Sequence, residues 1–301
     1  MNRLMPCAAA CLLFAAAAAV GICAVAAATE PCTKAAKAAV GNCSQTGQNN
    51  PLACRLANYR EHQDDAWDQL PAIGVRYVFM NVPAPEQVDT VAKQLADSGL
   101  KAAVLRGDTD LSRESSVEEL DRQLAVCEKM GVKYMFLSPK HPGVSKEVAY
   151  ERLRKIGDAA KNHGVTIGLE THPDLGTNGD EHVATMKAIN HPNIRVNFDC
   201  ANITYYNTET DAVAELKKCI DYVATVEIKD HNGQFKTWNF PALSRGVVDI
   251  PAVLDVLKRH GYQGPITIEI EGVEGVDRNR CEIEKDIAES MAYIRSLGTF
   301  D

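Results

Sequence analysis

The strongest constraint on the fold of this chain is a unit that recurs along its first part. In each copy a segment with helical periodicity ends in a glycine and a short apolar run follows; the glycines are Gly74, Gly99, Gly131 and Gly164. Glycine supplies the left-handed residue that commonly closes a helix, and a short apolar run is typical of a buried parallel strand. The glycines are 25, 32 and 33 residues apart, enough for one helix and one strand. The spacing therefore predicts repeated βα units and a parallel sheet.

Four further β-rich segments bring the predicted number of strands to eight. They are a weak one at 52–59 and three later ones at 195–202, 223–230 and 265–272. Eight parallel strands that alternate with helices, in about 250 residues, fit a closed barrel better than an open doubly wound sheet. The chain has no GxGxxG turn after its first strand and no GxxxxGK[ST] loop, so nothing supports a dinucleotide or P-loop fold. We predict an α/β fold, a single-domain (β/α)₈ TIM barrel over 51–299.

The N-terminus has the pattern of an export signal. Arg3 is followed by an Ala-rich apolar run that ends in Ala26-Ala27-Ala28, a small-residue cleavage pattern. This predicts a signal peptide over 1–28 and a periplasmic or secreted protein. An uncleaved membrane anchor is the alternative, because the run is long enough to span a bilayer.

Residues 29–50 are rich in Ala, Lys, Gln and Asn and are predicted to be a linker or an N-terminal extension. Within them Cys32 and Cys43 could pair in an oxidising compartment. Seven cysteines follow the predicted signal, and this odd number leaves at least one thiol free or paired outside the chain.

The charge balance narrows the range of partners. The chain has 32 basic and 40 acidic residues, a net charge of −8. An acidic surface without a basic stripe argues against nucleic acid and, once the signal is cleaved, against a membrane surface as partner. A small-molecule substrate is therefore expected, and whether the chain forms a homo-oligomer is left open.

Polar side chains at the ends of the last four predicted strands point to the site. In a barrel of this kind the active site lies at the C-terminal ends of the strands, and side chains alternate along a strand, so inward positions share parity. If the apolar residues of these strands face the helices, the inward residues are Glu170, His172, Asn197, Asp199, Glu227, Lys229, Glu269 and Glu271.

Clustered buried carboxylates need a counter-charge, and a divalent cation can supply it. We predict metal ligation by Glu170, Asp199, Glu227 and Glu269, with Mn²⁺ or Mg²⁺ favoured and Co²⁺ or Zn²⁺ possible. Each of these residues could instead be a solvated group at the rim of the barrel. Glu227 could also be neutralised by Lys229 rather than by a metal.

The remaining polar and aromatic candidates are assigned to substrate or to the rim. The predicted substrate contacts are His172, Lys140, Asn202, Lys229 and Trp238. His231 is predicted to be a solvated loop residue, and Phe240 to pack as part of a lid.

Five motifs together resemble the xylose isomerase-like barrels, a superfamily that includes sugar phosphate isomerases and epimerases. The motifs are LETH at 169–172, NFD at 197–199, IKD at 228–230, GVVD at 246–249 and GYQGPITIE at 261–269, within a resemblance over 52–298. The resemblance implies a metal held by Glu, Asp, His and Glu from strands five to eight. This chain departs from that pattern in two places. Glu227 replaces the metal-binding histidine, and Asn202 replaces a second histidine that often follows the aspartate of strand six.

The activity that the resemblance implies is an isomerase or epimerase reaction by proton transfer next to a carbonyl, through an enediolate. Glu170 and Glu269 would be the general base and acid. Two other functions use the same site: a dehydratase or lyase acting on keto-sugars or inososes, and a non-catalytic carbohydrate-binding barrel with a decayed metal site. An endonuclease-type phosphodiesterase is disfavoured, because such sites use many histidines.

Overall fold

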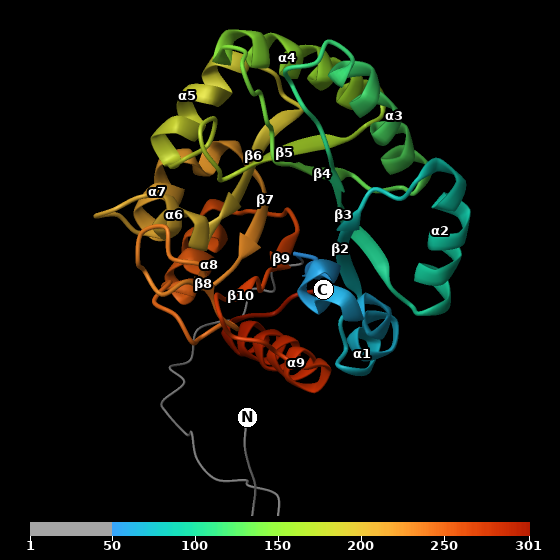
Figure 1. The fold of residues 1–301 in the computed structure, drawn as a ribbon, viewed down its shortest axis with the longest axis vertical. Helices are drawn as coiled ribbons and strands as arrows, with labels where there is room; N and C mark the ends of the chain where they lie inside the picture. Colours follow the sequence, from blue (N-terminus) through green and yellow to red (C-terminus); the bar gives the residue numbers. More distant parts are fainter. Residues whose placement is uncertain (1–49) are drawn as a thin grey trace, which may run out of the picture. The chain divides into compact units, whose positions relative to one another are not determined.

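The computed structural model describes residues 50–301, which form a closed parallel barrel with strand order β1-β2-β3-β4-β5-β6-β7-β9 (Figure 1). The barrel strands are β1 Leu52–Arg55, β2 Tyr77–Asn81, β3 Lys101–Gly107, β4 Tyr134–Leu137, β5 Thr166–Glu170, β6 Ile194–Asp199, β7 Val223–Ile228 and β9 Ile266–Ile268. The ring closes because β1 pairs with both β2 and β9. The predicted (β/α)₈ barrel is thus confirmed.

Helices connect the strands on the outside of the barrel (Figure 1). The α-helices are α1 Ala66–Ala72, α2 Val88–Asp97, α3 Ser116–Lys129, α4 Lys146–Asn162, α5 Gly179–Ile189, α6 Cys200–Tyr206, α7 Ala212–Cys219, α8 Ile250–His260 and α9 Arg280–Leu297. Short 3₁₀ segments are η1 Leu56–Asp65, η2 Pro85–Gln87 and η3 Ile220–Tyr222. The four repeated glycines all adopt φ between 65° and 76°, so the left-handed closure predicted for each βα unit is present.

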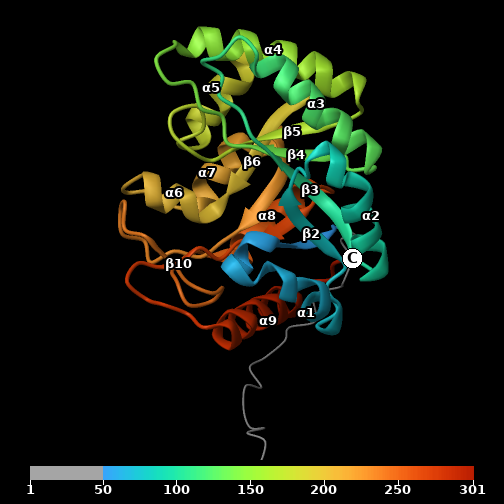
Figure 2. The same cartoon turned by 45° about the vertical axis from the view of Figure 1, so that its right-hand side comes forward.

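The four segments for which the sequence pattern indicated strand bounds all end earlier in the structure. Those at 195–202 and 223–230 end as β6 at Asp199, where α6 begins, and as β7 at Ile228. The segment at 52–59 leaves the barrel after Arg55 and turns into η1, where Arg60 has φ 53°. The segment at 265–272 divides: β9 ends at Ile268, and β10 Gly272–Val273 pairs antiparallel with β8 Asn239–Phe240. This small ribbon lies near α6, and both can be followed at one side of the barrel in Figure 2.

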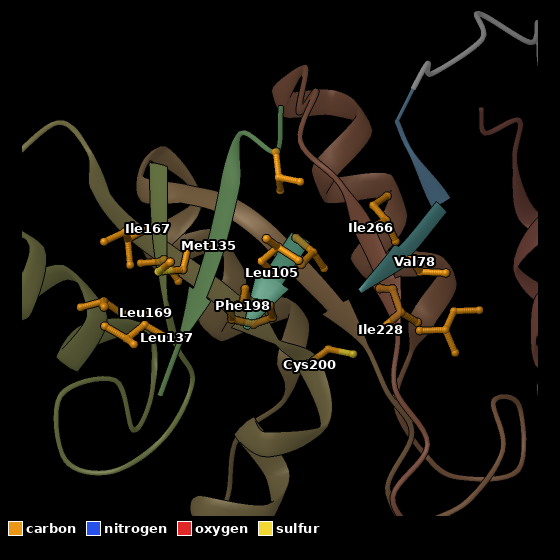
Figure 3. Packing of buried hydrophobic residues seen from close by; sticks show 14 of the residues in the cluster. Val78, Leu105, Met135, Leu137, Ile167, Leu169, Phe198, Cys200, Ile228 and Ile266 are labelled. Carbon is orange, nitrogen blue, oxygen red and sulfur yellow. The ribbon is translucent and has the colours of Figure 1, made fainter. Parts of the chain in front are cut away.

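The outward faces of the strands pack against the helices and form the main core. Ile167 and Leu169 of β5 lie beside Met135 and Leu137 of β4 (Figure 3), and all four are buried. Burial of such side chains contributes about 1.5–3 kcal/mol each. The outward parity predicted for the apolar residues is therefore confirmed, and it sends the alternate polar residues into the barrel.

The inside of the barrel has a small apolar cluster of its own. Phe79, Val104 and Phe136 come from β2, β3 and β4 and are buried together, with 5.3 Å between the two phenyl centroids. This cluster provides an aromatic surface next to the polar residues of the later strands.

Several predictions concern residues outside the described range. The signal peptide at 1–28, nearly all of the segment at 29–50 and the Cys32–Cys43 pair lie there. Within residues 50–301 all five cysteines are free thiols, and only Cys281 is exposed. No helix of this described part is long and apolar enough to cross a membrane.

Candidate active site

The carboxyl ends of the strands surround a polar hollow of about 260 Å³. All the residues predicted to contact substrate border it: Lys140, His172, Asn202, Lys229 and Trp238. Glu170, Glu269 and Glu271 border it as well, while Asp199 and Glu227 are fully buried behind it. The structure thus brings the predicted site residues together at one end of the barrel.

Three of the four predicted metal ligands form a compact carboxylate cluster. Glu170, Asp199 and Glu227 each offer an oxygen, and these oxygens lie within 4.8 Å of one another. They come from the ends of the adjacent strands β5, β6 and β7, and Asp199 is the direct register partner of Glu227. Three carboxylates at this spacing fit a hard divalent cation such as Mg²⁺ or Mn²⁺.

Asp199 is held in place by the start of α6. Its Oδ1 accepts hydrogen bonds from the backbone N–H groups of Ala201 at 2.9 Å and Asn202 at 3.0 Å, so it caps the helix. Burial nevertheless raises the pKa of Asp199 to about 7, although the nearby Lys229 opposes that change. The local sequence therefore orients this carboxylate before any ligand binds.

Arg55 is the site residue that the sequence reasoning missed. From the end of β1 its guanidinium donates to Glu227 Oε1 at 2.9 Å and also contacts Glu269 Oε1. Its Cζ lies over two aromatic rings, 4.7 Å from the centroid of Phe79 and 5.3 Å from that of Phe136. Such stacking is favourable for a desolvated guanidinium. An isolated arginine at the end of an otherwise apolar strand was the available signal.

The two carboxyl groups that contact Arg55 have pKa values shifted in opposite directions. Burial disfavours the charged form of Glu269, but Lys229 and Arg55 outweigh it and lower the pKa of this carboxyl group. Burial together with the charge of Glu269 raises the pKa of Glu227 well above its ordinary value. Between the two, Glu269 is the group held ionised and Glu227 is the one that takes up a proton more readily.

Lys229 is the second buried cation of the site. Its Nζ lies 3.4 Å from Asp199 Oδ2 and 3.1 Å from Glu269 Oε2, and it also pairs with Glu271. The ammonium is 4.2 Å from the centroid of Phe240. The ion pairs of the described residues do not include Lys229 with Glu227. The alternative that Lys229 neutralises Glu227 is therefore wrong; Arg55 has that role, because β1 lies just beyond β9 in the closed ring and brings the guanidinium to Glu227.

The aromatic residues beside the hollow form a rim. Trp238 is 41% exposed and its ring packs edge-on against Phe240, which is fully buried, as the lid prediction expected. Both rings contact Tyr205 of α6. His172 packs edge-on against Tyr206, with 5.0 Å between the ring centroids. These contacts leave Trp238 and His172 at the edge of the hollow, within reach of a bound molecule.

The polar side chains of Asn202 and His231 form hydrogen bonds within the protein. Asn202 donates to the carbonyl of Thr171 and accepts from Lys229, so its amide supports Lys229 within the site. His231, predicted to be solvated, is fully buried. Its Nδ1 is 2.8 Å from Thr204 Oγ1 and its Nε2 is 3.0 Å from the carbonyl oxygen of Thr237. The prediction failed because the loop after β7 folds back over α6.

The comparisons with known proteins agree with this architecture. The xylose isomerase-like TIM barrel family matches residues 67–297, and the chain belongs to that family. An L-ribulose 3-epimerase from Methylomonas sp. is 29% identical over 232 residues, covering 68% of this chain and 77% of the relative. Another from Mesorhizobium japonicum is 25% identical, covering 85% of this chain and 89% of the relative.

A solved structure shows the same fold. The xylose isomerase-like TIM barrel protein from Mycobacterium smegmatis, in complex with magnesium, superimposes with a TM-score of 0.66 at 17% identity. The superposition covers 82% of this chain and 96% of that protein.

Proposed function

We propose that this barrel is a metal-dependent sugar epimerase or isomerase that moves a proton on the carbon next to a ketose carbonyl. The observation that carries the proposal is the placement of Glu170 and Glu269, which both border the polar hollow from strands separated by β6 and β7. The names of its relatives as L-ribulose 3-epimerases support a ketose as the class of substrate.

The two carboxylates have complementary surroundings. Arg55 and Lys229 hold Glu269 in its ionised form, which suits it to remove a proton. Glu170 has no ion pair among the described residues, and we assign to it the return of a proton to the other face of the carbon. The proton leaves the substrate on one face, an enediolate forms, and a proton is added from the opposite carboxyl group.

The metal would be held by Glu170, Asp199 and Glu227. When bound, a divalent cation polarises the carbonyl and hydroxyl oxygens of the substrate and stabilises the enediolate charge. Glu269, the fourth ligand predicted from the sequence, lies outside this cluster, with its two oxygens against Arg55 and Lys229. We therefore assign Glu269 to proton transfer first, and to ligation only if it exchanges one of these contacts for the metal. Mg²⁺ is a reasonable first choice, as one barrel of this fold was solved with it.

Deuterium exchange tests the proposal. The protein is incubated in D₂O with Mg²⁺ or Mn²⁺ and a panel of ketoses, and the hydrogens next to the carbonyl are followed by NMR. We expect solvent deuterium to enter one of these positions, and EDTA to abolish the exchange. Absence of exchange with every sugar, with metal bound, would favour a non-catalytic carbohydrate-binding barrel. Loss of a β-hydroxyl group from the product would instead identify a dehydratase.

A further inference from the structure

The side of the barrel mouth formed by β3 and β4 contains two cations that form no ion pair with the carboxylates of the site. Arg106 is the penultimate residue of β3 and Lys140 follows β4. Both border the polar hollow together with Glu170 and Glu269. We propose that Arg106 and Lys140 form a subsite for an anionic group of the substrate, a carboxylate or a phosphate. This inference rests on the proposed function and narrows its substrate class.

Arg106 is a cation without a partner. Among the ion pairs of residues 50–301 it has none, and neither has Lys140. The Nε of Arg106 is buried and has no hydrogen-bond partner. The other two cations of the hollow differ in this respect, because Arg55 pairs with Glu227 and Glu269, and Lys229 pairs with Asp199, Glu269 and Glu271. A buried donor left without an acceptor is unfavourable, so a ligand that accepts a hydrogen bond from Arg106 would remove that penalty.

A second hollow extends the site beyond Arg106 and Lys140. It has a volume of about 660 Å³ and shares these two residues with the first hollow. Four cations border it, Arg106, Lys140, Arg113 and Arg122, against two carboxylates, Asp108 and Glu119. Glu119 is paired with Arg113 at 2.7 Å, and Asp108 is exposed. This local excess of positive charge occurs in a chain with a net charge of −8, and such a local field attracts anions.

The strand order places Arg106 and Lys140 on a different side of the barrel mouth from Glu269. In the eight-membered ring, β3 and β4 lie across the barrel from β7 and β9. A substrate with its anionic group at Arg106 and Lys140 would extend towards the carboxylates of β5, β6 and β9. The ketoses after which the relatives are named are neutral and need no such cations. The structure therefore points to a keto-sugar that carries a terminal carboxylate or phosphate, which arginine recognises through paired donors.

Binding of simple anions tests the subsite without catalysis. The probes are inorganic phosphate and D-gluconate, titrated by calorimetry into the full folded chain. We expect at least one to bind, and R106Q and K140Q each to weaken that binding about tenfold to hundredfold. R106K, which keeps the charge, should retain part of the affinity. K187Q, which removes an exposed lysine on α5, is the matched control and should bind like the wild type.

A kinetic arm separates this proposal from the proposed function. Deuterium exchange is compared for neutral ketoses, ketose phosphates and keto-sugar acids, and R106Q should lower the preference for the anionic substrate about tenfold or more. The preferred anion distinguishes a carboxylate from a phosphate. Exchange with neutral ketoses alone, with no anion binding or with equal binding in R106Q, would overturn the subsite while leaving the epimerase proposal intact. Anion binding that is lost in R106Q, without any exchange, would support the subsite and count against the epimerase.

Discussion

The two sides of the barrel mouth carry charge in different ways. On the side of β6, β7 and β9, buried carboxylates are already matched by Arg55 and Lys229. On the side of β3 and β4, Arg106 and Lys140 have no internal partner among the described residues. Matched buried charges are costly to disturb, whereas unmatched ones remain available to a ligand. Under the two proposals above, the first side would carry out the chemistry and the second would bind an anionic group of the substrate.

The largest expected effect tests the chemical role of the carboxylate side. Glu170→Gln keeps the size of the side chain but removes both its charge and its ability to transfer a proton. We expect the exchange rate to fall about 10²- to 10⁴-fold, and Mg²⁺ binding, followed by calorimetry, to weaken. Glu118→Gln, at an exposed position on α3, is the control. An E170Q enzyme within tenfold of the wild-type rate would remove Glu170 from the mechanism.

The second prediction concerns removal of the cation that pairs with Glu227 and Glu269. Arg55→Met keeps an apolar stem beside Phe79 and Phe136 but leaves Glu227 and Glu269 without their guanidinium. We expect the free energy of unfolding, measured by urea denaturation in EDTA, to fall by about 3–5 kcal/mol. Addition of E227Q to this variant should recover part of the loss, since one buried charge is then removed.

The control for this prediction is an ion pair on the surface. Arg259 pairs with Asp255 on α8 and its side chain is 79% exposed, so Arg259→Met should cost less than about 1 kcal/mol. If the two methionine variants were equally mild, Arg55 would be a replaceable neighbour of the carboxylates rather than their counter-charge.

The smallest expected effect is a change in the pH dependence of stability, caused by a buried histidine behind the carboxylates. His182 of α5 is fully buried, with its Nε2 3.0 Å from Thr171 Oγ1, and that oxygen accepts a hydrogen bond from the Asp199 N–H. Burial lowers the pKa of His182 to about 3. The unfolded chain, with a histidine pKa of about 6.5, therefore binds the extra proton between these values. The stability from the neutral ring is complete above about pH 6.5 and is lost towards pH 3, by about 1.4 kcal/mol per pH unit.

His182→Gln removes this part of the pH dependence, which urea titrations between pH 7 and pH 4 would detect as a shallower slope than in the wild type. His163 offers a contrast of opposite sign. A hydrogen bond to Glu128 raises the pKa of His163, so its contribution is present at low pH and is lost as the pH rises. Equal slopes in wild type and H182Q would show that His182 is solvated or already charged in the folded state.

The part of the site on β5, β6, β7 and β9 could be predicted because its signal is local. Alternation along a strand follows from backbone geometry alone, so the apolar neighbours of Glu170, Asp199, Glu227 and Glu269 were enough to turn these carboxylates inward. For Arg55 the only signal was a lone arginine at the end of a weak strand, and alternation along four residues does not reveal its partners. Nor could the sequence assign the partner of Lys229, because its contacts with Glu269 and Glu271 depend on the approach of β9.

The sequence by itself therefore determined the eight βα units, the closure of four of them by glycine, the family and the inward carboxylates, since each of these depends on short local motifs. Tertiary structure alone decided which of those charges meet. Arg55 reaches Glu227 and Glu269 because β1 closes the ring against β9, pairing Leu52 with Ile266. His231 is buried because the loop after β7 folds back over α6, where its ring contacts Thr204. Barrel closure brings together residues that are distant in the sequence, and no local pattern encodes the distance between them.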